Sequence, residues 1–340
     1  MSDFLFLSSF EVVTVKRKNY LAFALALILA LGLVGCGLGG GDEDDLPEVE
    51  EVLADPEYPV SAGGATIYFR PARVISLAPS LTEKIYDLGH HTRLVGISDH
   101  QGSFPPSIAH IPSFGIATMP DIDGILAVNP HLVFSVSELP ADAMSALAAR
   151  DIPLVILPSY AHSLAELEAI YLDISTILDG RTTGQIRGDR FVESFRERLD
   201  ALTAQTIGQH RMTAVYLRTL DFTMATGDTL EGELLERLGF ENIAADQTGW
   251  VFDPEHAAGE SRERFSGLEV IFLDENYIST QALSQSDFWQ GLGAVTNGQT
   301  VNIDSQIFER QSLRIFDQLE IMAGVLQGVI PEADDNNDEE

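Results

Sequence analysis

The chain has 340 residues, 45% of them hydrophobic, which is enough for one large domain or for two lobes with a real core. Asp and Glu number 52 against 20 Lys and Arg, giving a formal net charge of -32. A surface this acidic repels phosphate backbones, which excludes nucleic acid as a partner, and the single cysteine excludes internal disulfides and cysteine metal clusters.

The first 35 residues have the features of a secretory signal. Lys16-Arg17-Lys18 precede an apolar run of about 16 residues, which is shorter than the roughly 20 needed to cross a bilayer. The run ends in Leu33-Val34-Gly35-Cys36, which resembles the lipobox of bacterial lipoproteins, where the cysteine receives a diacylglyceryl group before cleavage. We therefore expect residues 1–35 to be a lipoprotein-type signal peptide and Cys36 to carry the lipid. An uncleaved membrane anchor is the alternative.

Both ends of the mature chain lack an apolar pattern. Residues 36–58 are rich in glycine and then acidic, which predicts a flexible tether with a reach of roughly 25 Å. Residues 331–340 form a second acidic stretch, expected to be disordered. Gly35, Gly37 and Gly40 match the dinucleotide fingerprint G-x-G-x-x-G, but an export segment precedes them and an acidic run follows, so the match is accidental.

Between these ends, short apolar runs alternate with helical patterns. Strands are expected at 73–77, 94–97, 132–136 and 154–157. Helices are expected from Ser80 to Leu88, at 121–129 and at 141–149. Ser80 and Glu83 have the spacing of a capping box at the start of the first helix.

A long helix interrupts this rhythm at 184–207. Its apolar residues recur at near-helical spacing, namely Ile186, Phe191, Phe195, Leu199 and Leu202. The alternation then resumes, with strands expected at 213–217, 270–273 and 300–303 and helices at 232–238 and 288–292.

This order of elements predicts an α/β fold with mostly parallel sheets. The two halves have similar patterns, so we expect two similar α/β lobes, at 59–183 and 208–330, joined by one long α-helix. In open α/β sheets ligands bind at the carboxyl ends of the strands, which predicts a ligand cleft between the lobes.

Several segments, in this order and spacing, resemble the cobalamin and iron–siderophore binding proteins of ABC importers. They open with Arg73-Val74-Ile75-Ser76-Leu77-Ala78-Pro79-Ser80, and the similar stretches are 73–83, 94–98, 104–106, 130–133, 234–243, 289–298 and 308–314. The resemblance covers about residues 58–328, nearly all of the mature chain. It implies two Rossmann-like lobes that move modestly and deliver a ligand to a permease and its ATPase.

The same resemblance implies a cargo rather than a resident cofactor. The cargo would be a corrinoid or an iron chelate, containing cobalt or iron, and the protein would be a monomer facing the periplasm or the cell exterior. A haem or zinc/manganese binding protein of the same architecture is one alternative. An extracellular hydrolase is another, although no G-x-S-x-G elbow, zincin helix or P-loop occurs in the sequence.

The resemblance also implies site residues. Asp123 and Glu260 would dock onto basic residues of the permease, although Asp123 could instead complement a helix N-terminus. The positions expected to contact ligand are His100, Phe114, Trp250, Ile307, Phe308 and Arg310. For three of these an alternative stays open: His100 could ligate a metal centre or be solvated, Phe114 could plug a lobe, and Arg310 could pair with ligand carboxylates or with protein groups near Glu309.

Overall fold

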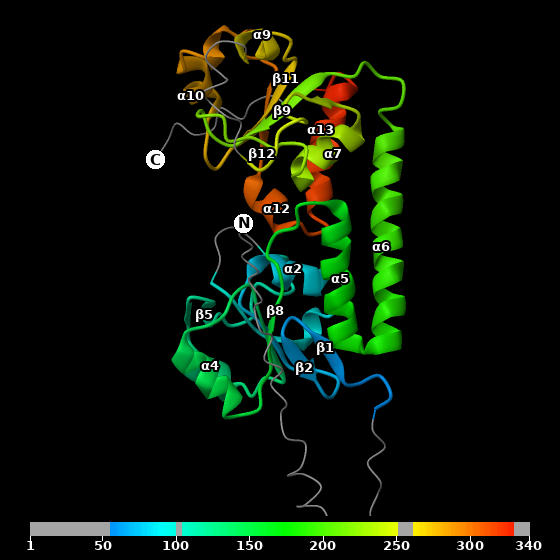
Figure 1. The fold of residues 1–340 in the computed structure, drawn as a ribbon, viewed down its shortest axis with the longest axis vertical. Coiled ribbons are helices and arrows are strands. Elements are labelled where there is room, and N and C mark those ends of the chain that lie inside the picture. Colours follow the sequence, from blue (N-terminus) through cyan, green and yellow to red (C-terminus); the bar gives the residue numbers. More distant parts are fainter. Residues whose placement is uncertain (1–54, 100–103, 251–260, 330–340) are drawn as a thin grey trace, which may run out of the picture. The chain divides into compact units, whose positions relative to one another are not determined.

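The computed structural model describes residues 55–99, 104–250 and 261–329, and within them two four-stranded parallel sheets form the centres of two lobes. These residues all belong to one compact unit, Ala54–Glu340 (Figure 1). No helix within the described residues is long and apolar enough to cross a membrane. The predicted signal peptide, Cys36 and the acidic tail lie outside the described residues.

The N-terminal lobe is built on a sheet with the strand order β4-β3-β7-β8. Its strands are β3 (Val74–Ser76), β4 (Leu94–Ile97), β7 (Leu132–Ser135) and β8 (Leu154–Ile156). Its helices are α2 (Pro79–Asp87), α3 (Ile122–Ala127), α4 (Ala141–Ala148) and α5 (Leu164–Asp179). The small elements are the hairpins β1 (Val60–Ala62) with β2 (Ala65–Ile67) and β5 (Gly115–Ile116) with β6 (Met119–Pro120), and the 3-10 turn η1 (His91–Arg93).

The C-terminal lobe repeats this topology with the strand order β10-β9-β11-β12, so that in both lobes the first strand of the sheet lies between the second and the third. Its strands are β9 (Thr213–Leu217), β10 (Glu241–Asn242), β11 (Val270–Asp274) and β12 (Thr300–Ile303). Its helices are α7 (Leu230–Leu238), α9 (Ser261–Phe265), α10 (Thr280–Gln285), α11 (Gly293–Thr296), α12 (Ser305–Arg310) and α13 (Ile315–Leu326), with the 3-10 turn η2 (Trp289–Gly291).

One long helix, α6 (Arg181–Ala204), joins the lobes and contacts α5, α7 and α13 (Figure 1). It starts three residues before the predicted 184 and ends three before the predicted 207. Its buried residues are Gly184, Gly188, Val192, Phe195, Leu199 and Leu202. The two glycines let α5 approach closely, because a Cβ at Gly184 would lie 2.5 Å from the carbonyl oxygen of Ser175. Ile186, one of the apolar residues at near-helical spacing, is exposed.

Both faces of each sheet are covered, as expected for parallel strands made of continuous apolar runs. One cluster of buried side chains extends through both lobes, from Val74 and Phe134 in the first sheet to Tyr216 and Phe272 in the second. Separate clusters cover the remaining face of each sheet. The lobes therefore share a continuous apolar core.

Two local predictions differ from the structure, and one helix was not predicted. Helix α2 begins at Pro79 with Ala78 as an N-cap that lacks a side-chain hydrogen bond, so Ser80 and Glu83 do not form a capping box. Ser163 caps the unpredicted helix α5 instead, accepting from the backbone N–H of Glu166. The predicted helix at 288–292 is the 3-10 turn η2.

Candidate ligand cleft

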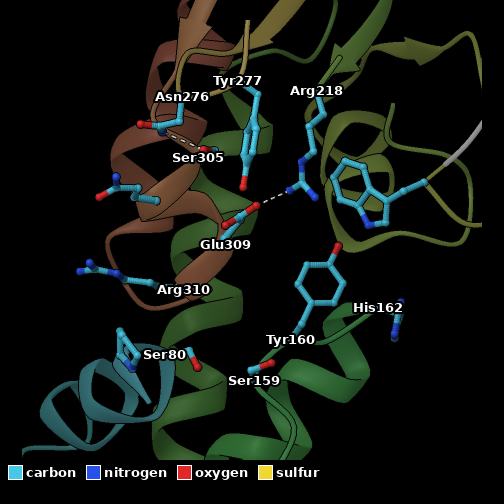
Figure 2. Close-up of a pocket in the computed structure, with 13 residues that line it drawn as sticks. Ser80, Ser159, Tyr160, His162, Arg218, Asn276, Tyr277, Ser305, Glu309 and Arg310 are labelled. Carbon is cyan, nitrogen blue, oxygen red and sulfur yellow. Dashed lines mark hydrogen bonds and ion pairs between the residues drawn. The ribbon is translucent and has the colours of Figure 1, made fainter. Parts of the chain in front are cut away.

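A cleft of about 710 Å³ lies where the carboxyl ends of the two sheets face each other (Figure 2). From the C-terminal lobe, Arg218 follows β9 directly, Tyr277 follows β11 and Ser305 follows β12. The N-terminal lobe contributes the segments after β3 and β8. The lining residues are Pro79, Ser80, Ser159, Tyr160, His162, Arg218, Trp250, Asn276, Tyr277, Ser305, Gln306, Glu309 and Arg310. This is the place where open α/β sheets bind ligands.

Arg218 is the centre of the C-terminal wall. Its guanidinium lies 4.2 Å from the ring centre of Trp250 and 5.7 Å from that of Tyr277. One nitrogen forms an ion pair of 2.5 Å with Glu309 Oε1 (Figure 2). The Nε atom lies 3.3 Å from Asp274 Oδ2. The cation is therefore held between aromatic faces and two carboxylates.

The carboxylates around Arg218 are hard to ionise. Burial raises the pKa of Asp274 and of Glu309 above their ordinary values, although the charge of Arg218 opposes the shift in both. Burial raises the pKa of the enclosed Glu231 to about 7, against a hydrogen bond from Tyr160 that lowers it. This wall therefore holds ionisable groups that titrate closer to neutral pH than ordinary carboxylates.

Two contacts next to the cleft connect the lobes through α7. The hydroxyl of Tyr160, from the N-terminal lobe, donates a hydrogen bond to Glu231 at the start of α7. The backbone N–H of Leu164, at the start of α5, donates to Glu233 Oε2 at 2.8 Å. Tyr160 also packs edge-on against Trp250, with ring centres 6.4 Å apart. The aromatic pair therefore spans the two walls.

A buried ionic junction joins α2 of the N-terminal lobe to the segment after α12. Glu83 receives a hydrogen bond from Arg310 at 2.5 Å and from the Ser312 hydroxyl at 2.6 Å, and Arg314 lies 3.3 Å away. The Glu83 side chain is 1% exposed. Charge-assisted bonds in such a site are strong and directional, so they hold the two walls of the cleft in register.

Lys84 and Asp87 extend this junction. The Lys84 ammonium is fully buried and donates to the carbonyl oxygen of Arg310 at 2.7 Å, and burial lowers its pKa to about 8. Asp87 accepts from the backbone N–H of Leu313 at 2.8 Å and from the Tyr171 hydroxyl at 2.7 Å, while burial raises its pKa to about 6. A rigid junction of this kind favours small relative motions of the lobes.

The structure places the residues expected to contact ligand in different surroundings. Trp250 and Arg310 line the cleft, and Arg310 forms an ion pair with Glu83. Ile307 is half-buried on α12. Phe114 and Phe308 are 8% and 1% exposed and belong to the core, which corrects their assignment to the cleft surface.

Phe114 and Asp123 do not line the cleft. Phe114 packs so closely against Gly96 that a Cβ there would lie 2.3 Å from its ring, which agrees with the alternative that it plugs the lobe. Asp123 is exposed in the first turn of α3, where Asp121 is the N-cap. His100 and Glu260 lie outside the described residues.

The sequence reasoning missed most of the polar residues of the cleft. Arg218, Tyr277 and Ser305 each come within a few residues of a predicted strand end, and that position was the available signal. Tyr160 and His162 follow β8, and His162 is exposed beside Tyr160, with ring centres 5.2 Å apart. Within the described ranges no group of three His, Cys, Asp or Glu side chains is arranged to hold a metal ion.

A family model described as "Periplasmic binding protein" matches residues 74–307. The chain belongs to this family of ABC importer proteins. An uncharacterized ABC transporter substrate-binding lipoprotein of Bacillus subtilis is 25% identical over 316 residues, covering 90% of this chain and 96% of that protein. A vitamin B12-binding protein of Yersinia pseudotuberculosis is 27% identical over 227 residues, 64% of this chain and 74% of that one.

The fold of this binding protein is found in solved structures. The periplasmic haem-binding protein of Vibrio cholerae superposes with a TM-score of 0.60 at 19% identity, covering 75% of this chain and 98% of that one. Membership of the family makes the chain a binding protein of an ABC transporter and not an enzyme. The cleft between the lobes is therefore a candidate site for the transported ligand.

Proposed function

We propose that this binding protein captures a corrinoid or an iron chelate outside the cytoplasm and delivers it to the permease of an ABC importer. The observation that carries the proposal is the aromatic cleft at the strand ends of both lobes. Its volume of about 710 Å³ is in the range of sites that enclose a large small-molecule ligand. The names of the similar proteins, which bind vitamin B12 or haem, support the same ligand classes.

The cleft offers the groups that such ligands need. Trp250, Tyr160 and Tyr277 provide aromatic surfaces for a broad, partly apolar ligand. Ser80, Ser159, Asn276, Ser305 and Gln306 provide hydrogen-bonding groups around them. A corrin ring edged with amides, or a hydroxamate chelate, has both apolar faces and amide-like oxygens and nitrogens. The lining therefore supports these two cargo types.

Equilibrium dialysis tests the proposal directly. The purified mature protein is dialysed against cyanocobalamin, cobinamide, haem and a ferric trihydroxamate, each of which absorbs visible light. We expect at least one corrinoid or iron chelate to bind with micromolar or tighter affinity. If none of the four is retained by the protein, the proposed cargo is wrong.

Anchoring and delivery form the second part of the proposal. The lipobox-like sequence ending in Cys36 supports a lipid anchor, as does the similarity to a lipoprotein of Bacillus subtilis. A tethered binding protein meets its permease at a raised effective concentration, which favours delivery. Metabolic labelling with a fatty-acid analogue, in wild type and Cys36→Ala, tests the anchor: label that persists in the variant would contradict it.

Permease docking through Asp123 and Glu260 is the third part. Asp123 is exposed on α3, near the exposed Met119 of the β5–β6 hairpin, as a docking residue must be. We expect Asp123→Lys combined with Glu260→Lys to abolish uptake of the identified cargo by cells and to leave its affinity in dialysis unchanged. Normal uptake by the double variant would refute the docking roles.

A further inference from the structure

A cluster of arginines lies at the end of the N-terminal lobe that is remote from the cleft. The carboxylate of Asp179 contacts the guanidinium groups of Arg70, Arg93 and Arg187 at 2.5, 2.8 and 2.9 Å, and His90 lies 3.0 Å from it. One carboxylate neutralises only one of these three cations. The Asp179 side chain is fully buried, whereas those of Arg70 and Arg187 are 52% and 46% exposed. Positive charge is therefore accessible at this surface.

The neighbouring charged residues do not reverse the sign of the cluster. Arg73 and Arg181 are exposed and add two cations. Asp55, which acts on Arg70, and Glu57, which acts on Arg181, add two carboxylates. With Arg93, Arg187 and Asp179 these residues are five arginines against three carboxylates, in a chain whose formal net charge is -32. The local charge is therefore opposite in sign to that of the whole protein.

Two exposed aromatic side chains adjoin these arginines. Tyr68 is 73% exposed and Phe69 is 55% exposed, and they directly precede Arg70. Phe69 packs edge-on against His131, with ring centres 5.5 Å apart, so it lies at the amino end of β7. Aromatic rings beside arginines are typical of protein surfaces that lie at the headgroup level of a bilayer. We call Tyr68, Phe69, Arg70, Arg73 and Arg187 the amino-end patch.

The chain enters the lobe at the same end. The carbonyl oxygen of Glu57 accepts a hydrogen bond from the backbone N–H of Arg181 at 3.0 Å, so the segment after Asp55 lies against the start of α6. In Figure 1 the hairpin β1–β2 and the first turn of α6 lie at the end of the N-terminal lobe that faces away from the C-terminal lobe. The 18 residues 37–54 separate Asp55 from Cys36, and such a length spans at most about 60 Å. A lipid on Cys36 therefore keeps this end of the lobe close to the bilayer.

We propose that the amino-end patch rests on the phospholipid surface of the membrane that carries the lipid anchor. The two aromatic rings lie at the headgroup level and the arginines contact lipid phosphates. This inference rests on the lipid anchor of the proposed function. The ligand cleft is at the carboxyl ends of the strands and the patch is at their amino ends, so this orientation holds the cleft away from the bilayer and open to solutes.

The acidic remainder of the chain does not prevent such a contact. Charges that lie farther from the lipid surface than a Debye length, about 8 Å at physiological ionic strength, are largely screened, whereas groups in direct contact are not. The tether also holds the patch at a high effective concentration near the bilayer, so a weak contact is sufficient. A weak contact also leaves the protein free to turn towards its permease.

Spin labelling of the lipid-anchored protein tests the orientation. The purified lipoprotein is reconstituted in vesicles of phosphatidylcholine and phosphatidylglycerol with a nickel-chelating lipid, which relaxes spin labels close to the bilayer. Because the sulfur of Cys36 carries lipid, Ala72→Cys supplies the single free thiol, at an exposed position beside the patch. Gln290→Cys, at an exposed position of the C-terminal lobe, is the matched control. We expect the relaxation enhancement at position 72 to exceed that at position 290.

Three results would overturn the proposal, and each is distinguishable. Equal enhancement at the two positions would show that the lobe has no preferred orientation on the bilayer. Enhancement at position 72 that appears only after the permease is added to the vesicles would assign the patch to a protein partner. Protein that does not remain with the vesicles would refute the lipid anchor itself, and with it this contact.

A pair of double variants assigns the contact to the aromatic side chains. Tyr68→Ser with Phe69→Ser should lose most of the enhancement at position 72, because the rings no longer enter the headgroup layer. Ile207→Ser with Val329→Ser removes two apolar side chains that are 77% and 62% exposed elsewhere, and should retain the enhancement. Both double variants should unfold at the urea concentration of the wild type, since all four side chains are exposed. Full enhancement in Tyr68→Ser with Phe69→Ser, or an equal loss in both double variants, would refute the role of the patch.

Discussion

Each lobe contains an ion cluster with a single central residue, and the two centres have opposite charge. In the N-terminal lobe the centre is Asp179, the last residue of α5, whose side chain is fully buried. Its partners are Arg70 at 2.5 Å, His90 at 3.0 Å, Arg93 at 2.8 Å and Arg187 at 2.9 Å. In the C-terminal lobe the centre is Arg218, with carboxylates around it.

The two clusters differ in their surroundings: the central carboxylate of the Asp179 cluster is enclosed by protein, and the Arg218 cluster borders the cleft. The Asp179 cluster joins α5, α6 and η1, and three arginines lie within 3 Å of its central carboxylate. The Arg218 cluster pairs its guanidinium with Asp274 and Glu309 and borders an open cleft. The side chain of Arg218 reaches the cleft and can contact a ligand, whereas the fully buried carboxylate of Asp179 cannot.

The largest effect is expected at Asp179. Asp179→Asn keeps the side-chain size but removes the charge that faces three arginines and His90. We expect the free energy of unfolding to fall by about 3 kcal/mol, because a buried ion pair that loses one partner leaves the others uncompensated. Urea unfolding measures this. Asp189→Asn on the exposed face of α6 is the matched control, and a loss below about 1 kcal/mol in Asp179→Asn would contradict the comparison.

The stability that Asp179 contributes should change with pH in the opposite direction to the stability that Glu231 contributes. For Asp179, burial alone would raise the pKa, but hydrogen bonds from His90 and Arg70 outweigh it and hold the pKa well below its usual range. A lowered folded pKa gives stability that is present above the unfolded value, about 4, and is lost as the pH falls below it. The difference in stability between wild type and Asp179→Asn should therefore shrink on acidification from about pH 4.

Glu231 should behave in the reverse way. Its pKa is raised from 4.5 to about 7, chiefly by burial, so its contribution is fully present below pH 4.5 and is lost as the pH rises towards 7. Glu231→Gln keeps an oxygen that can accept from Tyr160 and should be more stable than wild type at neutral pH, by about 3 kcal/mol at most. Urea unfolding from pH 4 to 8 measures it. A difference that does not grow with pH would show that Glu231 is not buried as a carboxyl.

Much of the fold could be predicted because the strands are continuous apolar runs. The ranges 94–97, 213–217 and 300–303 match β4, β9 and β12, since each run is bounded by polar or turn residues. Helix α5 was missed although Ser163 and Glu166 provide a start signal and Leu167, Ile170 and Ile174 recur at helical spacing. The helix could have been predicted, because both its start signal and its apolar spacing lie within the segment itself.

The site could be predicted much less well, because its contacts are distant in sequence. Glu83 and Arg310 are separated by 227 positions, and nothing in the spacing of either indicates the other. The Ser80–Glu83 spacing fits a capping box, but the partners from the opposite lobe determine where Glu83 points. Trp250 was expected in the cleft from the family resemblance, and that inference did not depend on knowing its contact partners.

A smaller effect, on ligand affinity, is expected when the aromatic ring beside Arg218 is removed. Trp250→Ala removes the ring that lies 4.2 Å from the guanidinium and the edge-on contact with Tyr160. We expect the affinity for the chelate that binds in dialysis to fall about tenfold, since an aromatic contact in a cleft is worth about 1 kcal/mol or somewhat more. Tyr68→Ala, at an exposed aromatic residue after β2, is the control. Equal affinities of Trp250→Ala and wild type would place the ligand elsewhere.

The smallest effect is expected for an ion pair that lies outside both clusters. Arg237 on α7 and Asp200 on α6 are 2.8 Å apart, but their side chains are 41% and 65% exposed. Water and salt screen such a pair, so Asp200→Asn should change the free energy of unfolding by no more than about 0.5 kcal/mol. Urea unfolding of both Asp200→Asn and Asp179→Asn gives the two changes in the free energy of unfolding for direct comparison. If the exposed pair proved as important as Asp179, burial would not be what distinguishes the N-terminal cluster, and its structural role would need another cause.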